Sequence, residues 1–303
     1  MDMQETTKIP AEAVELYTRF IHGEISRRAF GEGVAKYAVA GLTAGAIINA
    51  LMPNYANAHV AKDDERIKAS YVTIPSPDGN GSIKGYLVRP FSADTREATP
   101  AKLPGILVVH ENRGLNPHTE DVARRLALEN FMAFAPDCLT SLGGYPGDDY
   151  KGGQMFTKLD GAKRSADLLN SAKWLKARAD CTGKIGVTGF CFGGGVSNAL
   201  AGKMGAELAA AVPFYGGATP SADVPNIKAA VLIHHGALDA NAVKNWPAQE
   251  ADLKKNNVRY EGHIWPNSVH GFFNDATPER YNRETATKAW DRTIEWFNQY
   301  VRA

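Results

Sequence analysis

Short apolar runs alternate with longer segments of helical periodicity through most of the chain. The short runs, rich in β-branched and aromatic residues, predict strands. Their ranges are 69–74, 83–90, 103–110, 131–136, 184–188, 209–214, 229–235 and 258–265. The longer segments predict helices and cover 119–129, 161–177, 193–203, 246–256 and 278–300. This alternation is typical of an α/β protein whose doubly wound, mostly parallel sheet is covered by helices on both faces.

The first sixty residues have a different pattern. Arg27 and Arg28 precede a moderately apolar run over residues 37–52, and Ala56 and Ala58 follow that run. This order is the layout of a twin-arginine export signal with a small-residue cleavage site. The sequence therefore predicts an extension over residues 1–58, a mature domain over residues 59–303 and a periplasmic location. The apolar run is too short for a convincing membrane span, so we expect no permanent membrane anchor.

A second interpretation of the same extension is structural. Residues 11–52 would form amphipathic helices that pack on the following domain and are never removed, and the protein would stay in the cytoplasm. A pair of arginines is a weak pattern by itself, and the polar lead of the first 25 residues is long for a signal. Both interpretations place the domain boundary at the same point.

Composition and charge narrow the class of protein. With 44% hydrophobic and 22% charged residues, the 303-residue chain has the make-up of an ordinary soluble globular protein. Its 34 basic and 33 acidic side chains give a net charge of +1. Such a charge creates no field that would attract nucleic acid, so we expect a small-molecule substrate instead of a polyanion.

The three cysteines are too few for a disulfide framework or a zinc knuckle. Cys138, Cys181 and Cys191 form an odd set without a CxxC pair, so at least one thiol is free. Cys138 follows a predicted strand and is interpreted as a buried thiol, whereas Cys181 is interpreted as a loop thiol.

The most informative motif surrounds Cys191. An apolar strand runs into Gly189-Phe190-Cys191-Phe192-Gly193 and then into a predicted helix. This is the pattern of a nucleophile elbow, with cysteine in place of serine, and its crowded backbone requires the two glycines. The helix N-terminus would favour the thiolate, and the Phe192 amide would face a developing oxyanion. The alternatives are a phosphate-binding loop or a structural turn, but a dinucleotide fingerprint belongs at the first strand of the sheet.

An acid and a histidine follow the elbow in the chain order that this arrangement needs. Asp239 comes just after the predicted strand 229–235, and His270 lies in a later turn. His270 can accept the thiol proton while Asp239 holds its tautomer. Asp239 could instead be a turn residue, and His234 or His235 could supply the imidazole. We prefer His270, because the other two histidines lie within a predicted core strand.

A loop after the predicted strand 103–110 adds further candidates. In this arrangement that loop contributes oxyanion-hole amides, so Asn112 and Arg113 are assigned to the oxyanion hole and substrate pocket together with Phe192. Glu111 would lie close to the thiol and affect its ionisation. The alternative is a solvated acid paired with Arg113. Residues 142–154, rich in glycine, are expected to form a mobile loop near the site, and Tyr145 within it is assigned to the substrate pocket.

Over residues 66–303 the chain resembles the dienelactone hydrolases, or carboxymethylenebutenolidases, of the α/β-hydrolase superfamily. The motifs that carry the resemblance are His110-Glu111-Asn112-Arg113-Gly114, Ala135-Pro136-Asp137, Gly189-Phe190-Cys191-Phe192-Gly193-Gly194, Pro213-Phe214-Tyr215-Gly216, Asp239 and His270-Gly271-Phe272. The resemblance implies an α/β-hydrolase fold, a catalytic triad of Cys191, Asp239 and His270, and no metal or organic cofactor. It also implies that Glu111 helps to convert thiol to thiolate.

The chain departs from the best-known members in its N-terminal extension and in lacking an arginine shortly after the histidine. Family members use such an arginine to hold the substrate carboxylate, whereas here the next arginine is Arg280. We therefore expect hydrolysis of small lactones or activated esters without assigning dienelactone itself. A thiol redox enzyme and a non-catalytic binding protein on the same fold are the alternatives.

Overall fold

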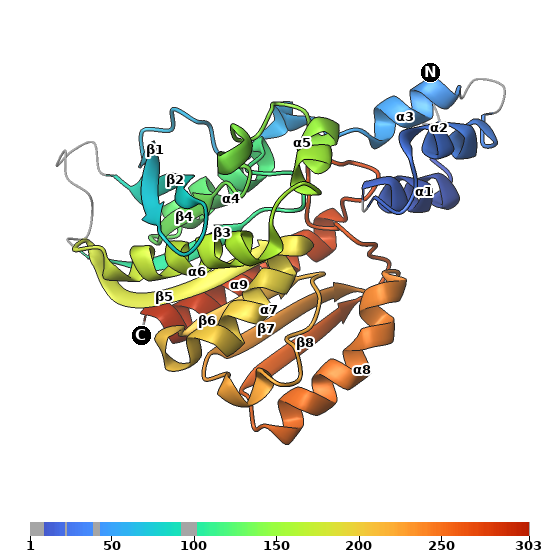
Figure 1. Ribbon diagram of the computed structural model, residues 1–303. Coiled ribbons are helices and arrows are strands. Elements are labelled where there is room, and N and C mark those ends of the chain that lie inside the picture. The colour runs from blue at the N-terminus through green and yellow to red at the C-terminus, as the bar shows by residue number, and fades with distance from the viewer. Residues whose placement is uncertain (1–8, 22, 39–42, 92–101, 303) are drawn as a thin grey trace, which may run out of the picture.

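The computed structural model describes residues 9–21, 23–38, 43–91 and 102–302. Its centre is an eight-stranded sheet with the order β1-β2-β4-β3-β5-β6-β7-β8 (Figure 1). The two pairs that involve β2 are antiparallel, and the remaining neighbours are parallel. The strands are β1 (Ile67–Ser76), β2 (Gly81–Pro90), β3 (Leu103–Val109), β4 (Met132–Pro136), β5 (Cys181–Phe190), β6 (Ala210–Phe214), β7 (Ala230–Gly236) and β8 (Tyr260–Trp265).

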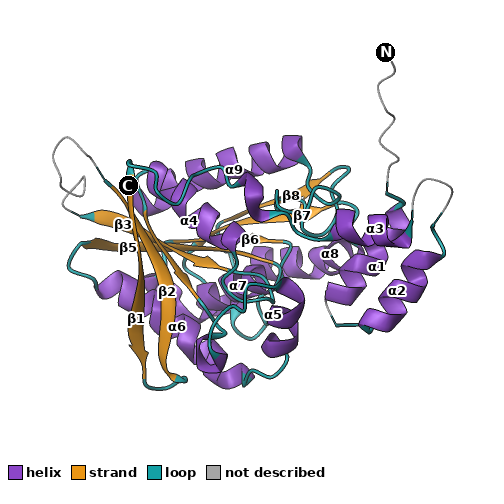
Figure 2. Cartoon of the chain, turned by 90° about the horizontal axis from the view of Figure 1, so that it is seen from above, coloured by secondary structure: helices purple, strands orange, loops and turns teal. Residues whose placement is uncertain are grey.

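Helices cover both faces of this sheet, as Figure 2 shows from above. The predicted α/β-hydrolase architecture is confirmed by this layering and by the strand order. The helices are α1 (Ala11–Ile21), α2 (Arg27–Ala35), α3 (Ala44–Leu51), α4 (Pro117–Leu128), α5 (Asp149–Phe156), α6 (Gly161–Ala177), α7 (Phe192–Met204), α8 (Ala240–Lys255) and α9 (Arg283–Phe297).

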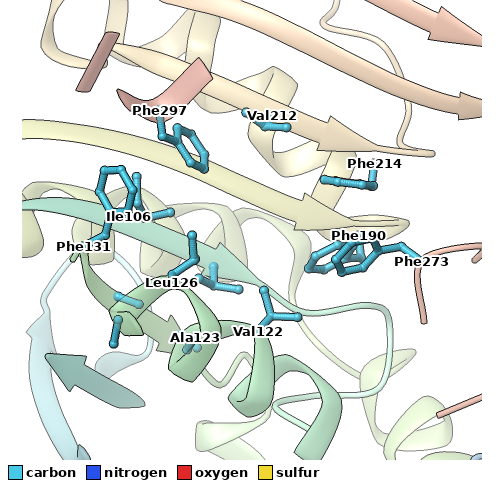
Figure 3. Packing of buried hydrophobic residues seen from close by; sticks show 14 of the residues in the cluster. Ile106, Val122, Ala123, Leu126, Phe131, Phe190, Val212, Phe214, Phe273 and Phe297 are labelled. Carbon is cyan, nitrogen blue, oxygen red and sulfur yellow. The ribbon is translucent and has the colours of Figure 1, made fainter. Parts of the chain in front are cut away.

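Alternation along the buried strands builds two separate cores. On β3, Ile106 and Val108 face the layer of α4 and α9, while Leu107 and Val109 face the layer of α6, α7 and α8. Figure 3 shows the first core, where Phe297 of α9 and Leu126 of α4 pack near Ile106. Since parallel strands are buried on both faces, their continuous apolar runs were recognisable in the sequence.

The N-terminal helices α1, α2 and α3 have a small core of their own. The rings of Phe20 and Phe30 stack with centroids 4.8 Å apart, and Phe20 also stacks on Tyr150 of α5 at 5.5 Å. Figure 1 shows these helices, in blue, on the side to which β7 and β8 point. The helices proposed by the structural interpretation of residues 11–52 are thus present, whereas export and cleavage stay a prediction. No described helix combines the length and the hydrophobicity that a bilayer crossing needs.

Three local predictions need correction. Part of the expected mobile loop 142–154 is helical, because Asp148 caps α5 by accepting a hydrogen bond from Lys151 N. Helix α8 starts at Ala240, six residues before the predicted start at 246, since Asp239 caps it and Pro247 is tolerated inside. Cys181 is the first residue of β5 and is only 4% exposed, so it is not a loop thiol. Cys138 is buried as predicted.

Candidate active site

The turn between β5 and α7 places Cys191 in a conformation that few side chains adopt. Its φ of 54° lies in the left-handed region, and its backbone N–H donates to Phe214 O at 3.1 Å. A Cβ on Gly189 would lie 2.2 Å from Gly193 O, and one on Gly193 would lie 2.1 Å from Val109 O. The glycines on either side of the cysteine are therefore sterically required, as the elbow pattern predicted. The turn leaves Cys191 partly exposed, unlike the two other cysteines.

Asp239 and His270 meet beside this turn. Nδ1 of His270 lies 2.6 Å from Oδ2 of Asp239, whose Oδ1 accepts a hydrogen bond from Ala242 N at the start of α8. The His270 imidazole also forms a hydrogen bond with the Cys191 side chain. The capping of α8 fixes one carboxylate oxygen of Asp239, so the other is held toward the imidazole. The structure thus brings the three predicted residues into one hydrogen-bonded chain.

The electrostatics of this chain favour a charged imidazole. Burial alone would lower the pKa of His270, but the interactions with Cys191 and Asp239 outweigh it and raise that pKa to about 10. Burial would raise the pKa of Asp239, yet its hydrogen bond to His270 holds that pKa below the ordinary value. Proton exchange between the thiol and the imidazole is therefore favoured in the direction of an ion pair.

The two rival histidines occupy different surroundings. His234 is buried in β7, where its Nδ1 accepts a hydrogen bond from Trp265 Nε1 at 3.2 Å. Burial lowers the pKa of His235 to about 4, although Asp239 and Gln249 act in the opposite direction. Burial also lowers the pKa of His234, so both imidazoles are neutral at physiological pH, and the histidine whose side chain bonds to Cys191 is His270.

Glu111 is a buried carboxylate, so its interpretation as a solvated loop acid is wrong. Its side chain is 5% exposed, and Oε1 has no hydrogen-bond partner among the described residues. Burial would raise the pKa of Glu111, but Arg280 and Arg113 outweigh it and bring that pKa below the ordinary value. Glu111 is therefore ionised, and His270 is among the cations that act on it.

Arg280 belongs to this neighbourhood although sequence reasoning gave it no role. It is 4% exposed, and a Cβ on Gly271 would lie 2.7 Å from its Nη1. The guanidinium therefore lies beside the residue that follows His270. The turn at 277–281 folds it back, with Arg280 N donating to Thr277 O at 3.0 Å. The sequence spacing between His270 and Arg280 did not predict this contact, because an arginine ten residues after a histidine has no fixed position in a loop.

A cavity of about 1070 Å³ opens in front of Cys191 and His270. Phe192 and Asp239 also line it, together with Leu238 at its exposed rim. Helix α1 supplies much of one wall. Its lining residues, which sequence reasoning missed, are Ala11, Val14, Glu15, Thr18 and Arg19.

Three residues assigned to the oxyanion hole or pocket lie outside this cavity lining. Asn112 Nδ2 donates to Ile21 O of α1 at 2.9 Å, and Arg113 lies 3.9 Å from Asp149. Tyr145 donates to the same Asp149 at 2.7 Å. These side chains contact α1 and α5 and support both helices. Helix α1 forms the part of the cavity wall that we had expected the loops to form. No cluster of His, Cys, Asp and Glu within the described ranges could hold a metal ion.

Comparisons with known proteins show which sequences and structures this chain is similar to. Residues 84–301 match the profile of the dienelactone hydrolase family. A "Putative carboxymethylenebutenolidase" from Escherichia coli O157:H7 is 30% identical over 257 residues, which cover 80% of this chain and 90% of the relative. A "Putative hydrolase fragment YghX" from Escherichia coli K12 is 49% identical over 120 residues, or 39% of this chain and 97% of the relative.

A solved structure supports the same comparison. The crystal structure of a "Putative Dienelactone Hydrolase" from Klebsiella pneumoniae matches with a TM-score of 0.66 and 29% identity. The match covers 77% of this chain and 99% of the other. The likeness to this solved structure is therefore one of fold as well as of sequence.

Proposed function

Because the chain belongs to the dienelactone hydrolase family and is a hydrolase, we propose that it cleaves small lactones or activated carboxylic esters with Cys191 as the nucleophile. The observation that carries the proposal is the hydrogen-bonded chain from Cys191 through His270 to Asp239 at the wall of the cavity. Nucleophile, base and orienting acid in mutual contact are the arrangement that nucleophilic acyl transfer needs.

In the first half of the reaction Cys191 Sγ attacks the carbonyl carbon of the substrate. The raised pKa of His270 supports a resting thiolate and imidazolium, so no proton has to move before attack. The backbone N–H of Phe192, at the start of α7, would stabilise the oxyanion together with the helix dipole. As the tetrahedral intermediate collapses, the C–O bond breaks and His270 gives its proton to the leaving alkoxide, which leaves a thioester.

In the second half water hydrolyses that thioester. Neutral His270 takes a proton from the water, and the resulting hydroxide attacks the carbonyl carbon. The C–S bond breaks, the carboxylic acid is released, and thiolate and imidazolium are restored. Asp239 keeps the imidazole oriented throughout, since its own second oxygen is fixed by Ala242 N.

Glu111, which is not among the residues that line the cavity, is proposed to favour the ion pair of Cys191 and His270. It is buried and ionised, and its charge acts on His270. A carboxylate near the imidazole stabilises the imidazolium and so promotes transfer of the thiol proton. Arg113 and Arg280 moderate this effect, because their positive charges also interact with the Glu111 carboxylate.

Cys191→Ala tests the proposal with a panel of aryl esters and lactones. We expect kcat/KM to fall at least about 10³-fold, because the nucleophile is removed while the cavity stays intact. Cys181→Ala is the matched control. It removes a buried thiol at the far end of β5 and should retain activity.

Two results would contradict this function. Equal rates in Cys191→Ala and the unmodified chain would remove the cysteine as nucleophile. Absence of turnover for every ester, together with trapping of a sulfenate at Cys191, would favour the thiol redox alternative. That alternative needs a resolving cysteine, and the two remaining cysteines are 2% and 4% exposed.

A further inference from the structure

Two arginines behind the site carry donors that nothing in the described structure satisfies. Arg113 and Arg280 are 4% exposed each. Arg113 Nη2 and Arg280 Nε and Nη1 have no hydrogen-bond partner among the described residues, and neither has Glu111 Oε1. Buried polar groups are normally paired, so unpaired guanidinium donors mark a place that a ligand can complete. The planar fork of donors suits a carboxylate.

These groups adjoin the cavity without reaching it. Arg280 lies against Gly271, the residue that follows His270. Arg280 and Glu111 both act electrostatically on Tyr215, which lines the cavity. Glu111, Arg113 and Arg280 are themselves absent from the wall that the described residues form. A side chain must therefore separate the arginines from the space in front of Cys191.

Tyr17 of α1 lies at that boundary. It is 1% exposed, and its ring centroid is 5.2 Å from the guanidinium carbon of Arg280. Burial would lower the pKa of Arg113, but Tyr17 and Asp149 act electrostatically in the opposite direction and that pKa is raised. Its neighbours on the helix, Val14 and Thr18, face the cavity. Tyr17 thus covers the arginines while the adjoining face of α1 forms the wall.

The charges on the cavity wall itself are predominantly negative. Glu15, Glu24 and Asp239 line it. The lining cations are Arg19, which pairs with Glu24 at 3.5 Å, and His270, which is held by Asp239 at 2.6 Å. A substrate carboxylate that enters the cavity would therefore meet acids, and the cations that it meets among the described residues already have partners.

From this arrangement we propose that Tyr17 is a specificity-determining residue. It closes an arginine-lined anion site next to the catalytic residues, and the cavity consequently selects neutral esters over esters that carry a carboxylate. The proposal rests on the proposed hydrolase function and adds the charge class of the substrate. Its determinant lies outside the part of the chain that matches the family profile, which begins at residue 84.

Two matched substrate pairs measure the selectivity. In the first, 4-acetoxybenzoate and the neutral 4-acetoxybenzamide place the difference in charge on the leaving group. In the second, the mono-4-nitrophenyl ester of adipic acid and that of its monoamide place it on the acyl part. We expect the unmodified full-length chain to favour the neutral member of at least one pair by about tenfold or more in kcat/KM, which corresponds to the ~1.4 kcal/mol of one missing charge contact. A preference for the anionic member in both pairs would overturn the proposal without any variant.

Tyr17→Ala opens the cover. We expect the anionic-to-neutral ratio of kcat/KM to rise about tenfold, mainly through KM of the anionic ester. Tyr17→Phe keeps the ring over Arg280 and should leave the ratio as in the unmodified chain. In the double variant Tyr17→Ala, Arg280→Leu the gain should disappear, which separates an opened anion site from a merely larger cavity.

The outcomes are distinguishable from failure of the hydrolase proposal. Each variant is compared by its ratio, and its folding is checked by circular dichroism and thermal melting. A folded Tyr17→Ala with an unchanged ratio would overturn the proposal while leaving Cys191 as the nucleophile. If the unmodified chain hydrolysed no neutral ester, the hydrolase function on which the proposal rests would instead be wrong.

Discussion

His270 has an interaction partner on each side, and both change its pKa in the same direction. Asp239 holds Nδ1 at 2.6 Å, and Cys191 provides the second hydrogen bond. Burial opposes both effects but is outweighed, so the pKa of His270 is raised to about 10. Charge at this residue is therefore a property of the pair of contacts and not of the exposure of the ring.

The pH profile of activity follows from this pKa. Because the imidazolium persists up to about pH 10, kcat/KM for an aryl ester should decline only in the alkaline range, well above the ordinary histidine value of about 6.5. Asp239→Asn removes interactions that raise the pKa of His270. In this variant the alkaline decline of kcat/KM should move toward neutral pH, and kcat should fall on the order of 10²–10⁴-fold. Rate measurements from about pH 6 to about pH 11 decide this, and superimposable limbs in the two proteins would contradict it.

At the scale of elements, the N-terminal helices are part of the site. Ser26 caps α2 by accepting a hydrogen bond from Ala29 N, and the twin arginines form the first turn of that helix. Arg27 lies over the ring of Tyr150 at 5.0 Å, and Arg28 pairs with Glu32 at 2.8 Å. These contacts give both arginines a place in a helical extension that is retained, while export and cleavage stay a prediction.

We propose, as the structural interpretation of the extension requires, that the working protein keeps its first 58 residues. Intact-mass analysis of the protein expressed in its own type of host cell should show the full chain of 32.7 kDa in the cytoplasmic fraction. Replacing Arg27 and Arg28 by lysine should leave mass and fraction unchanged. A periplasmic chain that begins near His59, and that is lost in the lysine variant, would restore the export interpretation.

The sheet and the elbow were predictable, but the cavity wall was not. Buried parallel strands have continuous apolar runs, and the glycines around Cys191 are required by contacts within the turn itself. Arg280 and Tyr17 meet across more than 260 residues of chain, and no local pattern encodes such a contact. Tyr145 was assigned to the pocket by proximity in sequence, whereas its hydroxyl bonds to Asp149 on the supporting helix.

At the scale of the whole molecule, Asp275 joins distant parts of the chain. It lies 3.0 Å from His118 Nδ1 of α4 and 3.1 Å from His59 Nε2, and it also pairs with Arg125. Burial would raise its pKa, but His118 and Arg125 outweigh it and hold that pKa far below the ordinary value. The carboxylate thus links the segment after α3, helix α4 and the loop after β8.

Asp275→Asn should destabilise the fold, because it leaves these partners without their anion. For a largely buried group we expect a loss of about 3 kcal/mol near neutral pH. A carboxyl group whose folded pKa is depressed stabilises the protein above its unfolded pKa of about 3.9, and this contribution is lost as pH falls toward the folded value. Urea unfolding of both proteins should show the difference at pH 7 and a smaller one at about pH 3. An equal difference at both values would contradict the assigned role.

The position of α1 has a consequence for how this enzyme could diversify. The residues proposed to perform the reaction lie within residues 84–301, whereas Val14 and Thr18, which line the same cavity, lie in a separate segment with its own small core. The proposed reaction and the residue proposed to set its selectivity are thus encoded in different segments of the chain. An exchange of the terminal segment between relatives could retarget the enzyme in a single recombination event, without disturbing the elbow or the sheet that supports it.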